Sequence, residues 1–253
     1  MKIGLVQYNP DWENKESNKK KLQKLFTELP DDVSLLIFPE LTLTGFTMRS
    51  SLFAEELEGD SINFFKGIAR EKNCHIITGL ILEIEGKYFN SAIHIDNSGE
   101  IIESYNKIHP FSMSGEDKNY TAGNLPAITQ VNQFKIGLSI CYDLRFPELF
   151  RFYGKEKVDL IVTIANWPIP RIEHWRTLIK ARAIENQCYI AGVNRVGKDL
   201  CHDYNGYSSV YNPMGNEIIS LIDKEEIIIA NINIEQVRET RNNLPFLNDI
   251  KLI

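Results

Sequence analysis

Four apolar runs of this 253-residue chain end abruptly in polar side chains that are capable of chemistry. A carboxylate follows the first run at Glu40 and a thiol follows the second at Cys141, while Asn166 and the pair Asn194-Arg195 follow the other two. In open α/β sheets, ligands bind just beyond the carboxyl ends of the strands. If the four runs are strands that lie side by side, their end residues therefore share one site.

Cys141 is the candidate nucleophile of this set. The segment after it passes from an apolar run into a polar turn and then into a helix that begins at Pro147. A thiol at such a turn lies near backbone N–H groups and the positive end of a helix, whereas a cysteine without this context is more often a small buried hydrophobe. Catalysis by a thiol also requires a base and a group that stabilises the oxyanion.

Histidine is the usual base for a catalytic thiol, but neither His109 nor His174 follows a strand end. Glu40 does, and a partly desolvated carboxylate can accept a thiol proton. Lys107 ends the run 101–107 and could supply a fixed positive charge for a developing oxyanion. On position alone, Glu40 could instead be a helix-capping or loop acid.

The strands that must position these groups are predicted by short apolar, β-branched runs, several of them apolar on consecutive residues as in strands covered on both faces. The runs span residues 3–6, 35–38, 75–78, 92–95, 136–140, 160–164, 189–193 and 227–230. Apolar residues at helical spacing predict helices over 15–29 and 172–186, and a third helix is expected from Pro147. Hairpin-like pairs at 81–102 and 207–219 add antiparallel edges. We expect an α/β fold with a mixed sheet or two stacked sheets and outer helices, in a single domain over 1–253, because no linker interrupts the chain.

Composition excludes several classes of protein. Asp and Glu total 34 against 28 Lys and Arg, and the resulting net charge of -6 argues against binding to a nucleic-acid backbone. No apolar run approaches the roughly 18 residues of a membrane span, and residues 1–7 lack the features of a secretory signal, which predicts a cytoplasmic protein. The four cysteines form no C-x-x-C pair, so we expect neither a disulfide framework nor a structural zinc site.

Three segments carry a specific resemblance to a known family. They are Phe38-Pro39-Glu40, the run 106–111 around Lys107, and the run 140–148 that begins Ile140-Cys141-Tyr142-Asp143. They look like the three signature segments of the nitrilase superfamily of carbon-nitrogen hydrolases, whose members use a Glu-Lys-Cys triad. The likeness covers nearly the whole chain, in the expected order. Pro110 departs from the family pattern, which commonly has Leu there, and this bears only on local loop geometry.

Within that superfamily the chain most resembles the omega-amidase branch, through segments 113–116, 120–124, 165–168, 180–187 and 192–197. The resemblance implies a four-layer α-β-β-α sandwich that usually forms a homodimer through a helical face. It also implies hydrolysis of the terminal amide of short 2-oxo dicarboxylic acid monoamides, especially 2-oxoglutaramate and 2-oxosuccinamate, with release of ammonia. No metal or organic cofactor is expected.

The resemblance also assigns catalytic roles. Cys141 would attack the amide carbonyl, and Glu40 would take the thiol proton and later deliver it to the departing ammonia. Lys107 and the backbone N–H of Tyr142 would stabilise the tetrahedral oxyanion. Glu116 matches the second glutamate of the family, which orients the lysine or the substrate, although it could be an ordinary loop acid.

The substrate itself needs further contacts, and the residues expected to supply them are Arg145, Trp167, Asn166 and Arg195. Arg145 is the first candidate for a substrate carboxylate, because a guanidinium pairs with a carboxylate through two parallel hydrogen bonds. It could instead pair with Asp143 or Glu148. Trp167 is expected in a pocket wall, but a tryptophan there could also simply fill the core.

Three alternatives stay open. The protein could act on another carbon-nitrogen substrate, such as an N-carbamoyl amino acid, a nitrile or an ordinary aliphatic amide. It could be a binding or regulatory protein that has kept the fold and lost activity, although the intact Glu40, Lys107 and Cys141 speak against this. Cys141 could also be a redox-sensing thiol, which the lack of a resolving cysteine nearby in the sequence disfavours.

Overall fold

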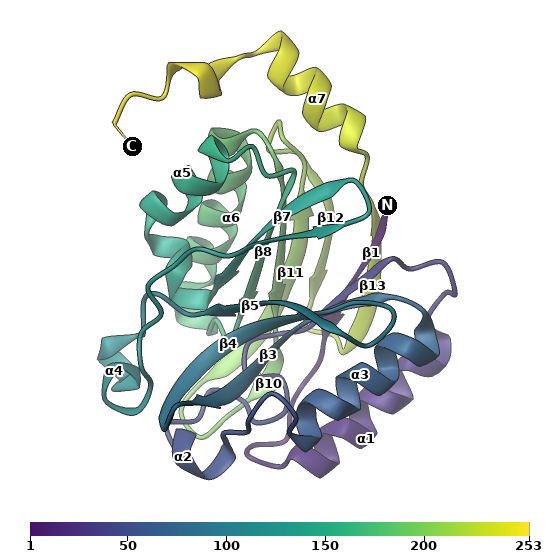
Figure 1. Cartoon of the computed structure of the whole chain (residues 1–253), viewed down its shortest axis with the longest axis vertical. Helices are drawn as coiled ribbons and strands as arrows, with labels where there is room; N and C mark the ends of the chain where they lie inside the picture. The colour runs from purple at the N-terminus through teal and green to yellow at the C-terminus, as the bar shows by residue number, and fades with distance from the viewer. Residues whose placement is uncertain (253) are drawn as a thin grey trace.

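In the computed structural model, which describes residues 1–252 and all of their side chains except that of Glu28, two β-sheets stack face to face between helices (Figure 1). The first sheet has six strands in the order β13-β1-β2-β3-β4-β5. Their bounds are β1 (Lys2–Gln7), β2 (Leu35–Ile37), β3 (His75–Ile84), β4 (Lys87–Ile95), β5 (Ile101–Asn106) and β13 (Glu226–Asn231).

The second sheet has seven strands in the order β10-β11-β9-β8-β7-β6, with β12 paired to β11. Their bounds are β6 (Ile128–Val131), β7 (Phe134–Ile140), β8 (Leu160–Ala165), β9 (Tyr189–Asn194), β10 (Val196–Lys198), β11 (Asp203–Tyr211) and β12 (Glu217–Ile222). Strands β7, β8 and β9 are parallel neighbours, so their carboxyl ends meet at one edge of the sheet.

Helices cover the outer face of each sheet. On the first sheet, α3 (Asp60–Lys72) packs on β3 and β4 and lies beside α1 (Lys15–Leu25), as Figure 1 shows. On the second, α5 (Pro147–Lys155) packs against α6 (Ile172–Asn186), which contacts β9 and β11. Inside, β1 contacts β9 and β11 while β4 contacts β7. The four layers are therefore helix, sheet, sheet and helix, which confirms the predicted α-β-β-α sandwich.

Shorter elements and the C-terminal helix complete the chain: η1 (Phe26–Glu28), α2 (Ser50–Phe53), η2 (Ser112–Ser114), α4 (Glu116–Asn119), η3 (Cys141–Arg145), η4 (Ile169–Arg171), α7 (Ile234–Asn243) and η5 (Phe246–Asp249). Helix α7 is anchored beyond the end of the sheets, where Arg241 donates to Val158 O at 2.5 Å. In the part of the chain that the structure describes, no helix is long and apolar enough to cross a membrane.

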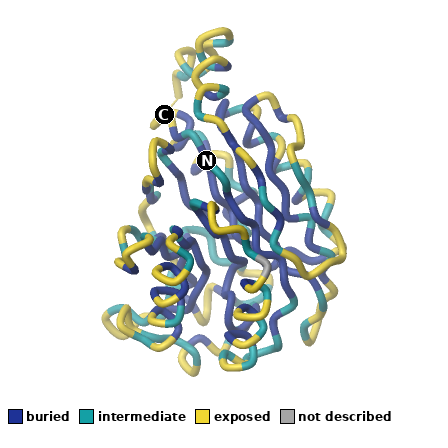
Figure 2. The backbone as a smooth tube through the Cα atoms, turned by 90° about the vertical axis from the view of Figure 1, so that its right-hand side faces the viewer, coloured by how far each residue is buried: buried dark blue, intermediate teal, exposed yellow. Residues whose placement is uncertain are grey.

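The hydrophobic core lies mainly between the two sheets, where Figure 2 shows the strands as continuously buried. Ile3 and Ile37 of the first sheet and Leu138 and Val162 of the second all belong to this cluster, and each is at most 1% exposed. Burying such a side chain contributes about 1.5–3 kcal/mol. The core thus fixes the two sheets face to face, which determines how residues from opposite sheets meet.

Most predicted elements are present, with a few differences at their ends. The helix predicted over 15–29 ends as an α-helix at Leu25 and tightens into η1. Pro30 explains this, since a proline pushes the preceding residue out of the helical region, and Leu29 is extended with φ -72° and ψ 128°. The sequence reasoning did not predict α3 or α7.

The condition stated for a shared site, that the four strands lie side by side, is met only in part. The four strands that end in polar residues do not all lie side by side, because β2, which precedes Glu40, belongs to the first sheet. Cys141, Asn166 and Asn194 follow or end neighbouring strands of the second sheet. The side chains nevertheless converge, because the ends of β2 and of β7 to β9 face one another across the interface between the sheets.

Candidate active site

Cys141 occupies a sharp turn directly after β7. Its φ of 47° lies in the left-handed region, which costs a non-glycine residue about 1–3 kcal/mol and therefore marks a position fixed by its surroundings. The turn redirects the chain from the strand into η3, and Cys141 lines a pocket of about 540 Å³. Tyr142 is next in η3, where the leading backbone N–H groups have no acceptor within the helix.

Behind this turn lies a buried cluster of one lysine and two glutamates. Lys107 Nζ donates to Glu40 Oε1 at 2.8 Å and to Glu116 Oε1 and Oε2 at 3.0 and 2.9 Å. Side-chain exposure is at most 1% for all three residues. The structure thus brings together Glu40 from the end of β2, Lys107 from the end of β5 and Glu116 from the first turn of α4.

Asn90 of β4 connects the two carboxylates, because its Nδ2 donates to Glu40 Oε1 and to Glu116 Oε1, both at 2.8 Å. Each carboxylate thus accepts a hydrogen bond from the Asn90 amide and one or more from the Lys107 ammonium group. Burial alone would lower the pKa of Lys107, but the charges of Glu116 and Glu40 raise that pKa well above its usual value. Lys107 therefore stays protonated and acts as a fixed cation.

Asn166, just after β8, links the cluster to the nucleophile. Its backbone N–H donates to Glu40 Oε2 at 2.9 Å, and its Nδ2 donates to Glu40 O at 2.7 Å. Its own backbone oxygen lies 4.0 Å from Cys141 Sγ. Burial and the charge of Glu40 raise the pKa of Cys141 well above its usual value, against the opposing effect of Lys107. The Cys141 thiol is therefore neutral at rest and would need a base to act as a nucleophile.

The two histidines considered as alternative bases have other partners. His109 Nδ1 lies 2.8 Å from Asp143 Oδ1, and its ring stacks on Phe146 with centroids 3.8 Å apart. His174 Nδ1 accepts from Arg145 Nη1 at 3.2 Å. The carboxylate of Glu40, in contrast, shares Asn166 with the thiol, so Glu40 is the base that this geometry favours.

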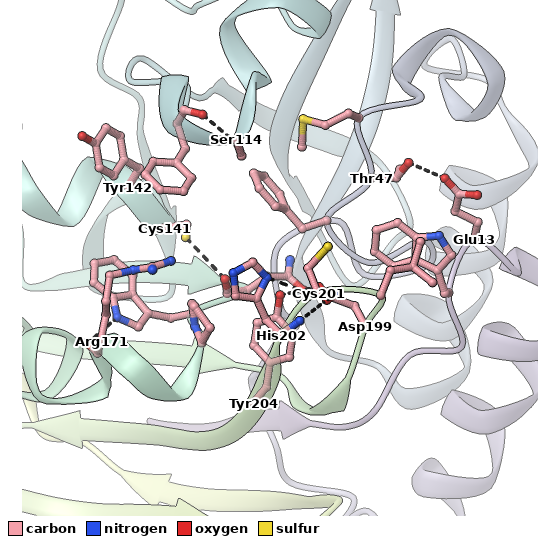
Figure 3. Close-up of a pocket in the computed structure, with 18 of the residues that line it drawn as sticks. Glu13, Thr47, Ser114, Cys141, Tyr142, Arg171, Asp199, Cys201, His202 and Tyr204 are labelled. Atoms are coloured by element: carbon pink, nitrogen blue, oxygen red, sulfur yellow. Dashed lines mark hydrogen bonds and ion pairs between the residues drawn. The ribbon is translucent and has the colours of Figure 1, made fainter.

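The pocket in front of Cys141 has a volume of about 540 Å³ and several aromatic rings in its wall. Figure 3 shows Cys141, Tyr142 and Arg171 on one side of it and Glu13 and Thr47 on the other. Arg145, Asn166 and Trp167 also line the pocket, so three of the four residues expected to contact substrate reach it. Trp167 is held by its backbone N–H, which donates to Asn194 Oδ1 at 2.7 Å.

The fourth, Arg195, does not line this pocket. It is fully buried, and its guanidinium packs 4.5 Å from the centre of the Tyr204 ring. It donates to the backbone oxygens of Val196 and Lys198, both at 3.1 Å. The expected contact between Arg195 and substrate is therefore corrected: Arg195 supports the wall formed by Tyr204 from behind.

Arg145 has neither of the carboxylate partners considered for it. Its guanidinium lies 4.7 Å from the centre of the Trp167 ring and 5.9 Å from that of Tyr142. Asp143, in contrast, points into the protein, where it accepts hydrogen bonds from Tyr105 OH at 2.7 Å and from Ile140 N at 2.9 Å. The Arg145 guanidinium thus lies within cation–π distance of two rings at the pocket wall.

Three features of this site were not predicted from the sequence. They are the residues Asn90 and Arg171 and the bridging role of Asp143. The signal available for Asn90 was an amide side chain two residues before the apolar run 92–95. Arg171 lies four residues after Trp167, just beyond the segment that was compared with the omega-amidases. Asp143 was considered only as a partner for Arg145, and its actual contacts with Tyr105 and Ile140 depend on tertiary structure.

This fold and this lysine-glutamate-cysteine site are typical of carbon-nitrogen hydrolases, and a comparison with known families gives the same result. A model of the family described as carbon-nitrogen hydrolase matches residues 2–242. The chain belongs to this family, within the nitrilase superfamily, which confirms the resemblance seen in its motifs.

Individual relatives show which members of the family this chain resembles. The chain is 34% identical to the omega-amidase YafV of Escherichia coli K12, over 98% of this chain and 96% of that protein. It is 36% identical to a 2-oxoglutaramate amidase of Paenarthrobacter nicotinovorans, over 85% of this chain and 77% of that one. Among solved structures, XC1258 from Xanthomonas campestris, a CN-hydrolase superfamily protein with an arsenic adduct in its active site, matches with a TM-score of 0.96. That match has 29% identity and covers 100% of this chain and 98% of the other.

Proposed function

We propose that this carbon-nitrogen hydrolase is an omega-amidase. It removes ammonia from the terminal amide of short 2-oxo dicarboxylic acid monoamides such as 2-oxoglutaramate and 2-oxosuccinamate. The observation that carries the proposal is the pairing, in one pocket, of a thiol next to a buried carboxylate with a guanidinium, Arg145, that has no carboxylate partner among the described residues. The relatives described as omega-amidase and 2-oxoglutaramate amidase support it.

The first half of the reaction forms a thioester. Glu40 accepts the proton of Cys141 as sulfur attacks the amide carbonyl, and the oxyanion of the tetrahedral intermediate is stabilised by Lys107 and the backbone N–H of Tyr142. Glu40 then gives the proton to the amide nitrogen, the carbon-nitrogen bond breaks and ammonia leaves.

The second half of the reaction hydrolyses the thioester and regenerates the free enzyme. Glu40 takes a proton from water as the water oxygen attacks the thioester, and the thiolate leaves and regains the proton. The free acid and the neutral Cys141 thiol are the products. Glu116 holds Lys107 in place throughout, and the charge of Lys107 is available to both tetrahedral intermediates.

Asn166 supports a preference for unsubstituted amides. Its Oδ1 is buried and has no hydrogen-bond partner within residues 1–252, although the residue lines the pocket beside Glu40. Such an acceptor suits an N–H donor of the substrate, because an unsatisfied buried acceptor costs about 1–3 kcal/mol. A primary amide that places its nitrogen between Glu40 and Asn166 satisfies it.

The test is ammonia release from 2-oxoglutaramate, glutamine, an N-carbamoyl amino acid and a nitrile, with wild type and Cys141→Ala. We expect turnover of 2-oxoglutaramate by wild type and none by the variant. Activity that survives in Cys141→Ala contradicts the mechanism. Turnover of only the nitrile or the carbamoyl compound contradicts the substrate assignment and leaves the thiol mechanism standing.

A further inference from the structure

The pocket contains two arginine side chains that lack a carboxylate partner among the described residues. Arg145 and Arg171 both line it, whereas Arg49, a third arginine of the wall, pairs with Glu13. The acidic residues of the wall are already bound: Glu13 also accepts from Thr47, and Asp199 accepts from the backbone N–H groups of 201 and 202, both at 2.8 Å. The charge left without a partner in this pocket is therefore positive.

Both guanidinium groups are held in place by aromatic rings. Arg145 lies between Trp167 and Tyr142 and donates to His174. Arg171 lies 5.6 Å from the centre of the Phe111 ring, and its backbone oxygen accepts from Trp167 Nε1 at 2.7 Å. Trp167 thus stacks on one arginine and hydrogen-bonds the segment that carries the other, which fixes the two relative to each other.

Two cations held in one pocket repel each other until an anion binds. Burial, and then the charge of Arg171, lower the pKa of Arg145, as expected for two cations that line one pocket. A carboxylate that contacts both guanidinium groups removes the repulsion and gains charge-assisted hydrogen bonds. The protein as a whole carries a net charge of -6, so these arginines are a local exception that favours an anionic ligand.

We infer that Arg171 is a specificity-determining residue, which together with Arg145 binds the carboxylate of the substrate while the amide end reaches Cys141. This rests on the proposed function. It adds a residue that motif comparison did not select, and it defines the preferred substrate as a primary amide with a carboxylate at its far end.

The main test compares one anionic and one neutral substrate. The ratio of kcat/KM for 2-oxoglutaramate to that for pentanamide is measured in wild type, Arg171→Gln, Arg145→Gln and the double variant. Each single variant should lower the ratio by about 10- to 100-fold, the range for loss of a hydrogen bond to a charged group. The double variant should lower it by less than the product of the single effects, because both arginines bind the same carboxylate.

Arg49→Gln is the matched control. It removes an arginine from the same pocket wall, but one that is already paired with Glu13, so the ratio should stay within about twofold of wild type by the same reasoning. A ratio for Arg171→Gln equal to that of wild type overturns the inference. An equal fall in Arg49→Gln also overturns it, since the effect would then be one of general pocket charge.

A second measurement separates failure of the inference from failure of the proposed function. Pentanoate, an unreactive monocarboxylate, should protect Cys141 against alkylation by iodoacetamide in wild type. In Arg171→Gln, the pentanoate concentration that gives half-protection should be at least about tenfold higher than in wild type, as expected for a lost charge-assisted contact. Equal protection of both proteins refutes the role of Arg171 even if no turnover of 2-oxoglutaramate is found.

Discussion

Replacing Asp143 with asparagine keeps the shape of the side chain but puts an N–H2 group where an oxygen now accepts two hydrogen bonds. Asp143 Oδ1 accepts from His109 N at 3.0 Å and lies 2.8 Å from His109 Nδ1. Its Oδ2 accepts from Ile140 N at 2.9 Å and from Tyr105 OH at 2.7 Å. This buried carboxylate therefore joins the turn of Cys141 to the segment that follows Lys107.

The free-energy cost of the substitution depends on which hydrogen-bond partners of Asp143 can change from donor to acceptor. The Tyr105 hydroxyl can rotate to accept, and His109 can change tautomer, but a backbone N–H can only donate. Whichever way the new amide points, one backbone donor, that of His109 or that of Ile140, loses its acceptor and faces an N–H2 group. An unsatisfied buried donor costs about 1–3 kcal/mol, so the free energy of unfolding should fall by about that amount.

Activity should fall as well, because relief of the clash moves either the nucleophile or the lysine. A displacement of about 1 Å in a catalytic group can lower the rate about 100-fold, so we expect a 10- to 100-fold loss in kcat/KM. Urea unfolding and ammonia release measure the two effects. Asp32→Asn, at a surface carboxylate paired with Lys2, is the control and should resemble wild type in both. Wild-type activity in Asp143→Asn would refute the idea that this carboxylate positions the two catalytic segments.

Three further predictions concern stability at low pH, the buried lysine-glutamate cluster and the oligomeric state. Burial, and then the charge of His75, lower the pKa of His94 to about 3. The unfolded state therefore binds more protons between about pH 6.5 and 3, and the free energy of unfolding should fall by up to about 1.4 kcal/mol per pH unit as pH drops through that range; acid titration of His94→Gln should show a shallower fall. Asn90→Leu removes a donor from Glu40 and from Glu116, and since a hydrogen bond to a charged group contributes about 1.5–3 kcal/mol, urea unfolding should show a loss of about 3 kcal/mol or more. The expected homodimer predicts a mass in solution of about twice 29.1 kDa by light scattering, and a mass of one chain would contradict it.

Much of the site could be predicted because its residues sit at positions that local sequence specifies. Lys107 and Cys141 come directly after β5 and β7, and Glu40 lies three residues after β2. Strand ends of this kind can be located from hydrophobic pattern alone. The pattern does not say which strands are neighbours. Pairing and stacking are set by long-range packing, so the pattern left open whether one mixed sheet or two stacked sheets form, and β2 and β7 lie in opposite sheets.

Residues that act through a partner were harder to predict. Asn90 lies within β4, and only the stacking of tertiary elements brings the two carboxylates to its amide group. Arg195 shows the opposite error. A strand-end arginine suggests a ligand contact, yet here its side chain turns back to bind the backbone of its own hairpin. Side-chain direction at a strand end depends on the loop that follows, which local pattern does not encode.

The distribution of charge also gives the substrate a direction. Two carboxylates and one ammonium group leave the inner cluster with a formal charge of -1, while the outer wall holds two cations without carboxylate partners among residues 1–252. An anionic monoamide is attracted to the wall and repelled from the cluster, so its neutral amide end enters first. Hydrolysis then creates a new carboxylate at that inner end, next to Glu40 and Glu116. Neighbouring like charges in a site with little water repel each other strongly. If the protein is the proposed omega-amidase, the cluster that favours entry of the neutral end of the substrate would therefore also favour release of the product.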